Sequence, residues 1–503
     1  MPFADVPPPT PPASPPRQVQ VSTLDLSLTA EQVPVAPGLK MGLVGLHALR
    51  PVTPDLSVGP SVFGAASGDR GGFFGWGLSA AYRWRTGDWS AEAGLFVGGG
   101  GGSPPWVGGG LMLRPSLLLS RDVGPLRLGL GVSQVNFPSG TVRATVPFAS
   151  LSWTGDTLFG PAGGGSWLAT EGWSDRAWPT ETGATVGQYN LRKGSARRDG
   201  TGNASPLRVG GVVFKRDLPG ALIGDGAALR PYWLLSTAGS ITAVYAGYAE
   251  FLGGLGLRYA LPSHPTLALR AEAAVGSGGN GTALDTAGGL LGKAGVGLSW
   301  QLGRQWGVTA LAGLTESRGR FSTHEVRVEM AWQGWDAVPG GARSPEPPSA
   351  ALAWKPWTGS AGWAQYTATR RADGSDPGLG VVTLKLEREI GPHWRVTGQA
   401  AIASNGNAGG YATGQLGVGW LGSALFDQRW RFGAEASLGA AGGGAVEVGN
   451  GMIAQVQGVA RYAVTPGWAL QVDAGWLRSR NGALSTPFVG LSSVASFSRL
   501  QAP

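Results

Sequence analysis

The chain contains no cysteine and only four histidines among its 503 residues. Without cysteine there can be no disulfide, no thiolate metal site and no covalently attached haem of the CxxCH type. An HExxH motif and an acidic loop with calcium-binding spacing are also missing. We therefore expect no metal and no other cofactor.

Long apolar runs are lacking as well. No stretch of 18 or more apolar residues occurs, which excludes a transmembrane helix. The first twenty residues are rich in proline and lack the apolar segment of a signal peptide. We expect the numbering to begin after the cleavage site of an exported precursor.

Alternation of apolar and polar residues is the strongest positive signal, and it is clearest near the end of the chain. Trp430, Phe432 and Leu438 fall on one side of an extended strand, whereas Arg431 and Glu435 fall on the other. The runs 454–462 and 468–476 repeat this pattern. A period of two predicts β-strands with one apolar and one polar face.

The length of these runs indicates strands that cross a bilayer. They cover about ten residues or more, and about 9–11 tilted residues span a membrane. Trp468 and Trp476 share an apolar face and would lie roughly 20 Å apart along the membrane normal. The expected membrane-interface aromatics are Tyr82, Trp84, Trp430, Trp468 and Trp476. The alternative is a soluble antiparallel sandwich or propeller, which would bury these indoles.

We therefore predict an all-β fold, a large antiparallel transmembrane β-barrel. The strand count is expected between 16 and 26, with about 24 as the best value. A proline-rich tether covers 1–20 and the barrel covers 21–500, with long inserts at 154–205 and 336–360. Both inserts fall on the side of the short periplasmic turns, opposite the longer outer loops. They are expected either to contain further strands or to act as plugs or docking surfaces.

The polar faces supply candidates for the lining of a pore. These are Arg83, Arg85, Arg270, Glu272, Glu325, Arg327, Glu329, Lys385, Glu387, Arg395, Arg429, Arg431, Glu435, Arg461 and Asp473. They could form mutual salt bridges that stiffen the wall, or an eyelet that favours anions because basic residues outnumber acids. A second basic cluster in the first insert, Arg192, Lys193, Arg197 and Arg198, could bind an anion or be a solvated surface.

No enzyme is predicted from the histidines. His264 and His393 fall in predicted turns, and His47 and His324 fall in strands, on or near the lipid face. A hydrolase would need a histidine beside a serine and an acid. The test is whether any imidazole nitrogen lies within hydrogen-bonding reach of a serine hydroxyl in one pocket. The five consecutive glycines at 98–102 lack the lysine and helix of a phosphate-binding loop.

With these strands and glycine-rich loops, the chain resembles Gram-negative outer-membrane β-barrel proteins, porin-like in general, over about 23–500. The resemblance implies an outer-membrane location in the cell envelope, with the lipid bilayer and lipopolysaccharide as partners. The net charge of +8 is scattered rather than clustered, so nucleic acid is not expected. The proline tract is either a disordered tether or a segment that docks on a periplasmic partner.

Two functions remain open from the sequence. The first is a passage: a porin, channel or export conduit for a solute or polymer, or a barrel that houses a partner protein. The alternative is a plugged barrel that acts as a structural anchor, scaffold or surface receptor. The width of the lumen discriminates between them, because barrels of 16 or more strands leave an aqueous channel unless they are filled.

Overall fold

The computed structural model describes residues 21–69, 71–102, 106–162, 172–192, 195, 205–218, 229–279, 284–339, 343–344 and 348–502. These ranges form 24 β-strands and two short 3-10 helices, η1 (Ser174–Arg176) and η2 (Ala243–Tyr245). The prediction of an all-β antiparallel barrel fold with about 24 strands is confirmed. Neither helix of the described ranges is long enough to cross a membrane. The predicted tether at 1–20 lies outside the described residues.

The first eight strands close on themselves as barrel I. They are β1 (Val21–Ala36), β2 (Leu39–Pro51), β3 (Leu56–Gly68), β4 (Phe74–Thr86), β5 (Trp89–Gly101), β6 (Leu111–Val123), β7 (Leu126–Asn136) and β8 (Arg143–Leu158). Each strand pairs antiparallel with its neighbour, and β1 pairs with both β2 and β8. Ser27, for example, lies opposite His47 on one side and opposite Ser152 on the other. The ring is therefore complete after residue 158.

The next eight strands form barrel II in the same way. They are β9 (Ala177–Leu191), β10 (Leu207–Asp217), β11 (Leu229–Ser240), β12 (Ala249–Leu261), β13 (His264–Gly279), β14 (Leu290–Leu302), β15 (Trp306–Ser317) and β16 (Ser322–Ala337). β16 pairs with β15 and also with β9, which closes the ring.

The last eight strands form barrel III. They are β17 (Ala353–Tyr366), β18 (Leu379–Glu389), β19 (Trp394–Ala403), β20 (Ala412–Leu421), β21 (Trp430–Gly442), β22 (Met452–Thr465), β23 (Trp468–Ser479) and β24 (Ser485–Ala502). β24 closes this ring by pairing with β17 and β23. Barrels II and III are joined by two residue pairs between β16 and β24, Trp335 with Ala502 and Asp336 with Gln501.

The strands thus form three narrow barrels of eight strands each, whereas the sequence predicted one wide barrel over 21–500. Alternation in a sequence predicts which face of a strand is buried, but it does not predict which distant strand closes the ring. The two long inserts are explained by this division. The first contains the end of β8 and all of β9, and the second contains the end of β16 and the start of β17. Both include the connections that lead from one barrel to the next.

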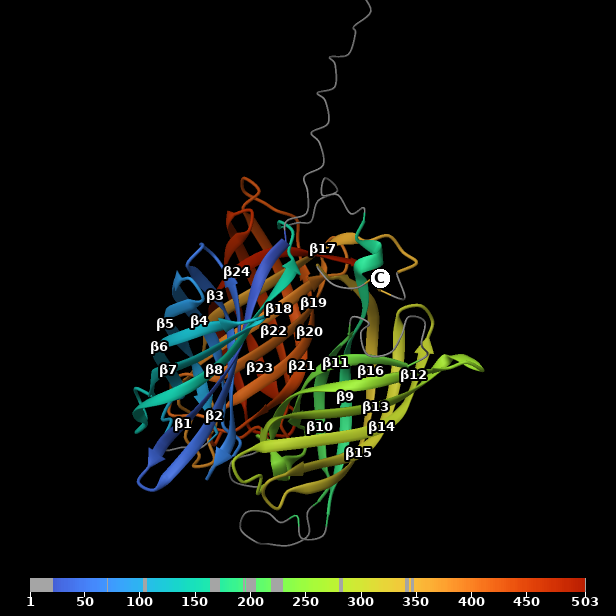
Figure 1. Cartoon of the computed structure of the whole chain (residues 1–503). Helices are drawn as coiled ribbons and strands as arrows, with labels where there is room; N and C mark the ends of the chain where they lie inside the picture. The colour runs from blue at the N-terminus through green and yellow to red at the C-terminus, as the bar shows by residue number, and fades with distance from the viewer. Residues whose placement is uncertain are drawn as a thin grey trace, which may run out of the picture.

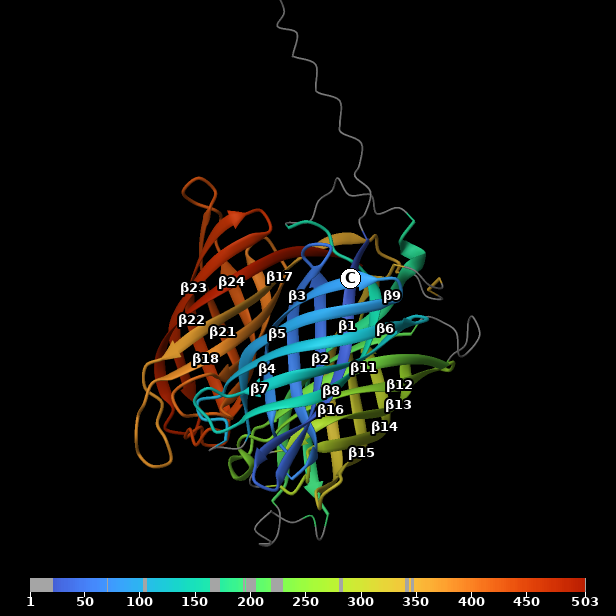
Figure 2. The same ribbon diagram turned by 60° about the vertical axis from the view of Figure 1, so that its left-hand side comes forward.

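The three barrels pack side by side (Figures 1 and 2) with an internal threefold pattern. The fifth strand of each barrel contacts the third strand of another: β5 contacts β19, β13 contacts β3, and β21 contacts β11. Because the same pair of strand positions is used at each junction, the arrangement is cyclic, like that of a closed homotrimer.

Local backbone structure repeats with the same threefold pattern. The carbonyl groups of Phe73, Tyr248 and Tyr411, each at the entry of a fourth strand, accept hydrogen bonds at 3.0, 2.9 and 2.9 Å from the N–H groups at equivalent third-strand ends. The aromatic side chains of all three are buried. An Ala-Glu-Ala triplet also recurs in each fifth strand, at 91–93, 271–273 and 434–436. The chain is therefore built from three copies of one eight-stranded unit.

Glycines permit the close approach of the barrels at the end that carries the longer loops. A Cβ atom on Gly101 of barrel I would lie 1.8 Å from the backbone nitrogen of Gly410 in barrel III. A Cβ atom on Gly442 of barrel III would lie 2.2 Å from the backbone nitrogen of Gly247 in barrel II. Any side chain at these positions would push two barrels apart.

The outer faces of the barrels are apolar. Leu117, Leu130, Val296, Leu438 and Val456 are all more than half exposed. The indoles of Trp430, Trp468 and Trp476 are 37%, 41% and 47% exposed. A soluble sandwich that buries these side chains is therefore excluded.

Candidate functional site: the interiors of the three barrels

Twelve of the fifteen side chains predicted to line a lumen are buried. These are Arg83, Arg270, Glu272, Glu325, Arg327, Glu329, Lys385, Glu387, Arg395, Glu435, Arg461 and Asp473. The other three, Arg85, Arg429 and Arg431, are exposed next to turns at strand ends. The structure distributes the buried set over all three barrels, so no single ring of charges forms.

Barrel I holds two clusters of ion pairs. The Arg83 guanidinium donates to Asp25 at 2.6 Å and to Glu92 at 2.8 Å. Arg114 donates two hydrogen bonds to Glu31, each 2.8 Å long, and its guanidinium lies over the rings of Phe63 and Phe148. Bidentate pairs of this kind are the strongest that arginine forms with a carboxylate.

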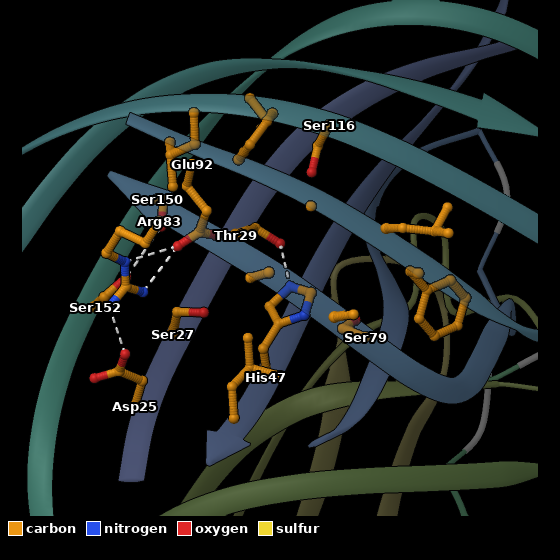
Figure 3. A pocket seen from close by; sticks show the side chains of 18 of the residues that line it. Asp25, Ser27, Thr29, His47, Ser79, Arg83, Glu92, Ser116, Ser150 and Ser152 are labelled. Atoms are coloured by element: carbon orange, nitrogen blue, oxygen red, sulfur yellow. Dashed lines mark hydrogen bonds and ion pairs between the residues drawn. The ribbon is translucent and has the colours of Figure 1, made fainter. Parts of the chain in front are cut away.

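A small cavity lies between these two clusters (Figure 3). Its volume is about 50 Å³, and its lining includes Asp25, His47, Arg83 and Arg114. This volume can hold a few water molecules but not an organic solute. The cavity is therefore a small gap among the side chains that line barrel I.

His47 points into this cavity, which corrects the expectation that it lies on or near the lipid face. It is 6% exposed, and its Nδ1 and Nε2 atoms lie 2.8 Å from Ser61 Oγ and 3.1 Å from Thr29 Oγ1. The neighbours of His47 in β2 are apolar on both faces, so alternation there did not determine its direction. The distance test for a histidine beside a serine is met by His47 and Ser61. However, the second ring nitrogen of His47 contacts the Thr29 hydroxyl group, where a catalytic triad would have an acid. In addition, the Ser61 hydroxyl group donates its hydrogen bond to Ser79 Oγ and not to His47.

Barrel II is filled by a larger network centred on two lysines. Lys215 donates to Glu272 at 2.5 Å and to Glu329 at 2.6 Å. Lys293 donates to Glu250 at 2.6 Å and to the hydroxyl group of Tyr189 at 2.5 Å. Further contacts link these centres to the wall: Arg327 with Glu272 at 2.6 Å, and Arg270 with Glu181 at 2.5 Å. The interior of this barrel is thus occupied by side chains that neutralise one another.

Barrel III combines ion pairs with a row of amides. Glu387 accepts from Arg395 and Arg461 at 2.9 Å, and Lys385 pairs with Glu435. Beyond them, Gln415, Gln455, Gln457, Gln471 and Asp473 are joined by hydrogen bonds. These charged and amide side chains therefore pair with one another inside the barrel.

Several interior residues were missed from the sequence, namely Asp25, Glu31, Glu92, Arg114, Glu181, Lys215, Glu250 and Lys293. The recurring Ala-Glu-Ala triplet is the signal that could have found one of them, Glu92, because the other two triplets contain the predicted Glu272 and Glu435. Its glutamates, Glu92, Glu272 and Glu435, each pair with a basic residue inside their own barrel. Recognition of the internal repeat in the sequence would have shown that these three positions are equivalent.

The remaining predicted sites are only partly described. Arg192, next to the end of β9, donates to Glu316 at 3.1 Å and to His324 Nε2 at 3.2 Å. Lys193, Arg197 and Arg198 lie outside the described residues. Tyr82 and Trp84 are exposed and lie 4.8 Å apart at their ring centroids. Among the described residues, no group of three or more histidine or acidic side chains could hold a metal ion.

Comparisons with known proteins give no family. No protein-family model matches the chain, and no curated protein matches it in sequence. A mutant of the ferric enterobactin receptor PfeA of Pseudomonas aeruginosa is 10% identical, with 96% of this chain and 82% of that chain covered and a TM-score of 0.29. The porin OccK5 (OpdH) of the same organism is 8% identical, with 95% and 98% covered and a TM-score of 0.23. Its siderophore receptor PirA is 9% identical, with 96% and 81% covered and a TM-score of 0.26. Because all three TM-scores are low, the strand arrangement described above is defined by the hydrogen bonds within this chain and not by these similarities.

Proposed function

We propose that this protein is an outer-membrane scaffold or anchor, made of three closed barrels whose interiors are filled. The observation that carries the proposal is the occupation of each lumen by paired charges, above all the contact of Lys215 with Glu272 and Glu329. Eight strands leave an interior just wide enough for side chains to fill, whereas porins with an aqueous channel have 16 or more.

The outer surface supports insertion into a membrane. Leucine, valine and tryptophan side chains face outward from all three barrels, and closed rings leave no unpaired strand edge, as a bilayer demands. Three barrels present a wider membrane footprint than one, and their glycine-rich loops come together at one end. These features suit a rigid platform that holds other envelope components, with residues 1–20 as a tether to a periplasmic partner.

A passage is the competing function, and single-channel recording separates the two. We expect the purified full chain, inserted into a planar bilayer, to give no steady conductance steps, while a 16-stranded porin in the same bilayer gives them. Insertion is checked by flotation of the protein with liposomes. Large, stable steps from the inserted chain would contradict the scaffold proposal and favour a conduit.

A further inference from the structure

Three arginines and three tryptophans lie on the outside of barrels II and III, at the end of the molecule that carries the C-terminus. Arg216 comes from β10, Arg388 from β18 and Arg499 from β24. Each lies within three residues of the end of its strand, and therefore within about 10 Å of the rim of its barrel. All three side chains are half-buried. Their neighbours Lys215, Glu387 and Ser498 are buried on the opposite face, so the arginines point out of the barrels.

Aromatic rings hold the three guanidinium groups in place. The Arg388 guanidinium carbon lies 3.9 Å from the ring centroid of Trp332 in barrel II and 5.7 Å from that of Trp357 in barrel III. Arg499 lies on the same Trp357 ring at 5.9 Å, and Arg216 lies on Trp233 at 5.1 Å. Arg388 thus crosses the junction between the two barrels. Stacking of this kind orients a guanidinium and leaves its N–H edge free to donate.

The carboxylate at this junction is already occupied. Asp336 accepts from Arg499 at 2.6 Å through one oxygen and from the Gln501 amide through the other. It also acts on Arg216 and Arg388 electrostatically, but neither of them has a salt-bridge partner among the described residues. The Nε atom of Arg388 is buried without a hydrogen-bond partner in this part of the chain. Three guanidinium groups therefore face a single carboxylate, and Lys355, opposite Arg499 in β17, adds a further positive charge.

We infer that this junction binds the phosphate group of an anionic membrane lipid. Guanidinium groups match phosphate oxygens in a bidentate geometry, and basic pockets between membrane-spanning elements bind anionic headgroups. The inference rests on the proposed membrane location, because only there does the rim lie at headgroup depth. Trp332 and Trp357 fit that depth, since tryptophan is enriched at membrane interfaces. The lipid would fill the junction and fasten barrel II to barrel III.

The test uses the full chain in detergent micelles, with bound lipid counted by native mass spectrometry. Phosphatidylglycerol, phosphatidylcholine and inorganic phosphate are titrated separately. We expect phosphatidylglycerol to bind in preference to phosphatidylcholine. The double variant Arg216→Gln/Arg388→Gln should bind it at least roughly tenfold more weakly, because each lost hydrogen bond from a guanidinium group to the phosphate costs about a tenfold factor. The variant Arg388→Lys keeps the charge but not the bidentate geometry, and it should lose part of this affinity.

The matched control is Arg85→Gln/Arg431→Gln, which removes two exposed arginines at strand ends next to turns. The inference is overturned if both double variants lose affinity equally, if neither does, or if inorganic phosphate displaces the lipid as well as phosphatidylglycerol does. Folding of each variant is verified by its migration in unheated SDS gels. If the wild-type chain fails to float with liposomes of any composition, the proposed function itself fails. If it floats but shows no preference for the anionic lipid, only the lipid site fails.

Discussion

At the scale of single residues, the fold depends on buried charges that are almost all paired. Lys215 is 2% exposed and lies between two carboxylates. A buried ion pair adds little to the free energy of unfolding compared with apolar side chains of similar volume. The loss of one partner is costly, however, because the other charge stays buried without compensation. The interiors are therefore sensitive to single neutralising substitutions and tolerant of changes on the outer faces.

Lys215→Met tests this sensitivity. We expect the substitution to lower the free energy of unfolding by about 3–5 kcal/mol, because Glu272 and Glu329 lose a shared cation. The measurement is urea-induced unfolding of the protein in liposomes. Lys40→Met, at an exposed position in β2, is the control and should change the value little. An equal effect of both substitutions would show that the interior pairing is not the cause.

A second prediction concerns pH and the two loops of barrel II that follow β13 and β15. Asp285 accepts a hydrogen bond of 3.0 Å from Arg320 and one of 3.2 Å from the Ala287 amide. Burial alone would raise the pKa of Asp285, but these bonds outweigh it and hold the pKa below its ordinary value of 3.8. A lowered pKa in the folded state stabilises the loop above pH 3.8, and this contribution is lost as the pH falls through the lowered value.

Hydrogen exchange of the loop around 284–289 provides the measurement. In the wild-type chain, exchange corrected for its intrinsic pH dependence should rise below pH 3.8. In Asp285→Asn the corrected rate should be independent of pH over the same range. A wild-type profile that stays flat to pH 2 would rule out this role for the carboxylate.

At the scale of elements, the strands could be predicted from the sequence and their closure could not. The alternation of Trp468, Leu470 and Val472 with buried Gln471 and Asp473 predicted β23 and the direction of its side chains. β2 was less informative, since the residues around His47 are apolar on both faces. The pairing of β1 with β8 depends on contacts more than 100 residues apart, which no local pattern encodes.

The glycine contacts between barrels lead to a third prediction, which belongs to the scale of elements. Gly101→Ala would place a methyl group against the backbone of Gly410, so barrels I and III must separate. We expect a loss of about 1–3 kcal/mol, as for an overpacked core. Gly414→Ala is the control, because a Cβ atom there meets nothing within 4 Å. Thermal unfolding of both variants in the same detergent compares them, and equal melting temperatures would argue against tight packing of the barrels.

At the scale of the whole molecule, one polypeptide chain contains three similar eight-stranded barrels in succession. Its threefold pattern was readable in principle from the triplets at 91–93, 271–273 and 434–436, but a search for strand periodicity alone does not detect a repeat of this length. Most of the predicted interior residues do lie inside, but they are divided among three barrels and do not line one common lumen. Charges that would have formed one wide eyelet instead fill three narrow interiors.

Cysteine cross-linking of the intact chain tests this division most directly, because the native sequence contains no cysteine. Leu28 in β1 lies opposite Leu151 in β8, where three separate rings place it. In one large ring β1 would instead adjoin β24, in which the exposed Ala495 lies seven residues from the strand end, as Leu28 and Leu151 do in their own strands. The chain with Leu28→Cys and Leu151→Cys should be joined rapidly by a short thiol cross-linker, whereas Leu28→Cys with Ala495→Cys should not. Cross-linking of the second pair and not the first would contradict the three-barrel account.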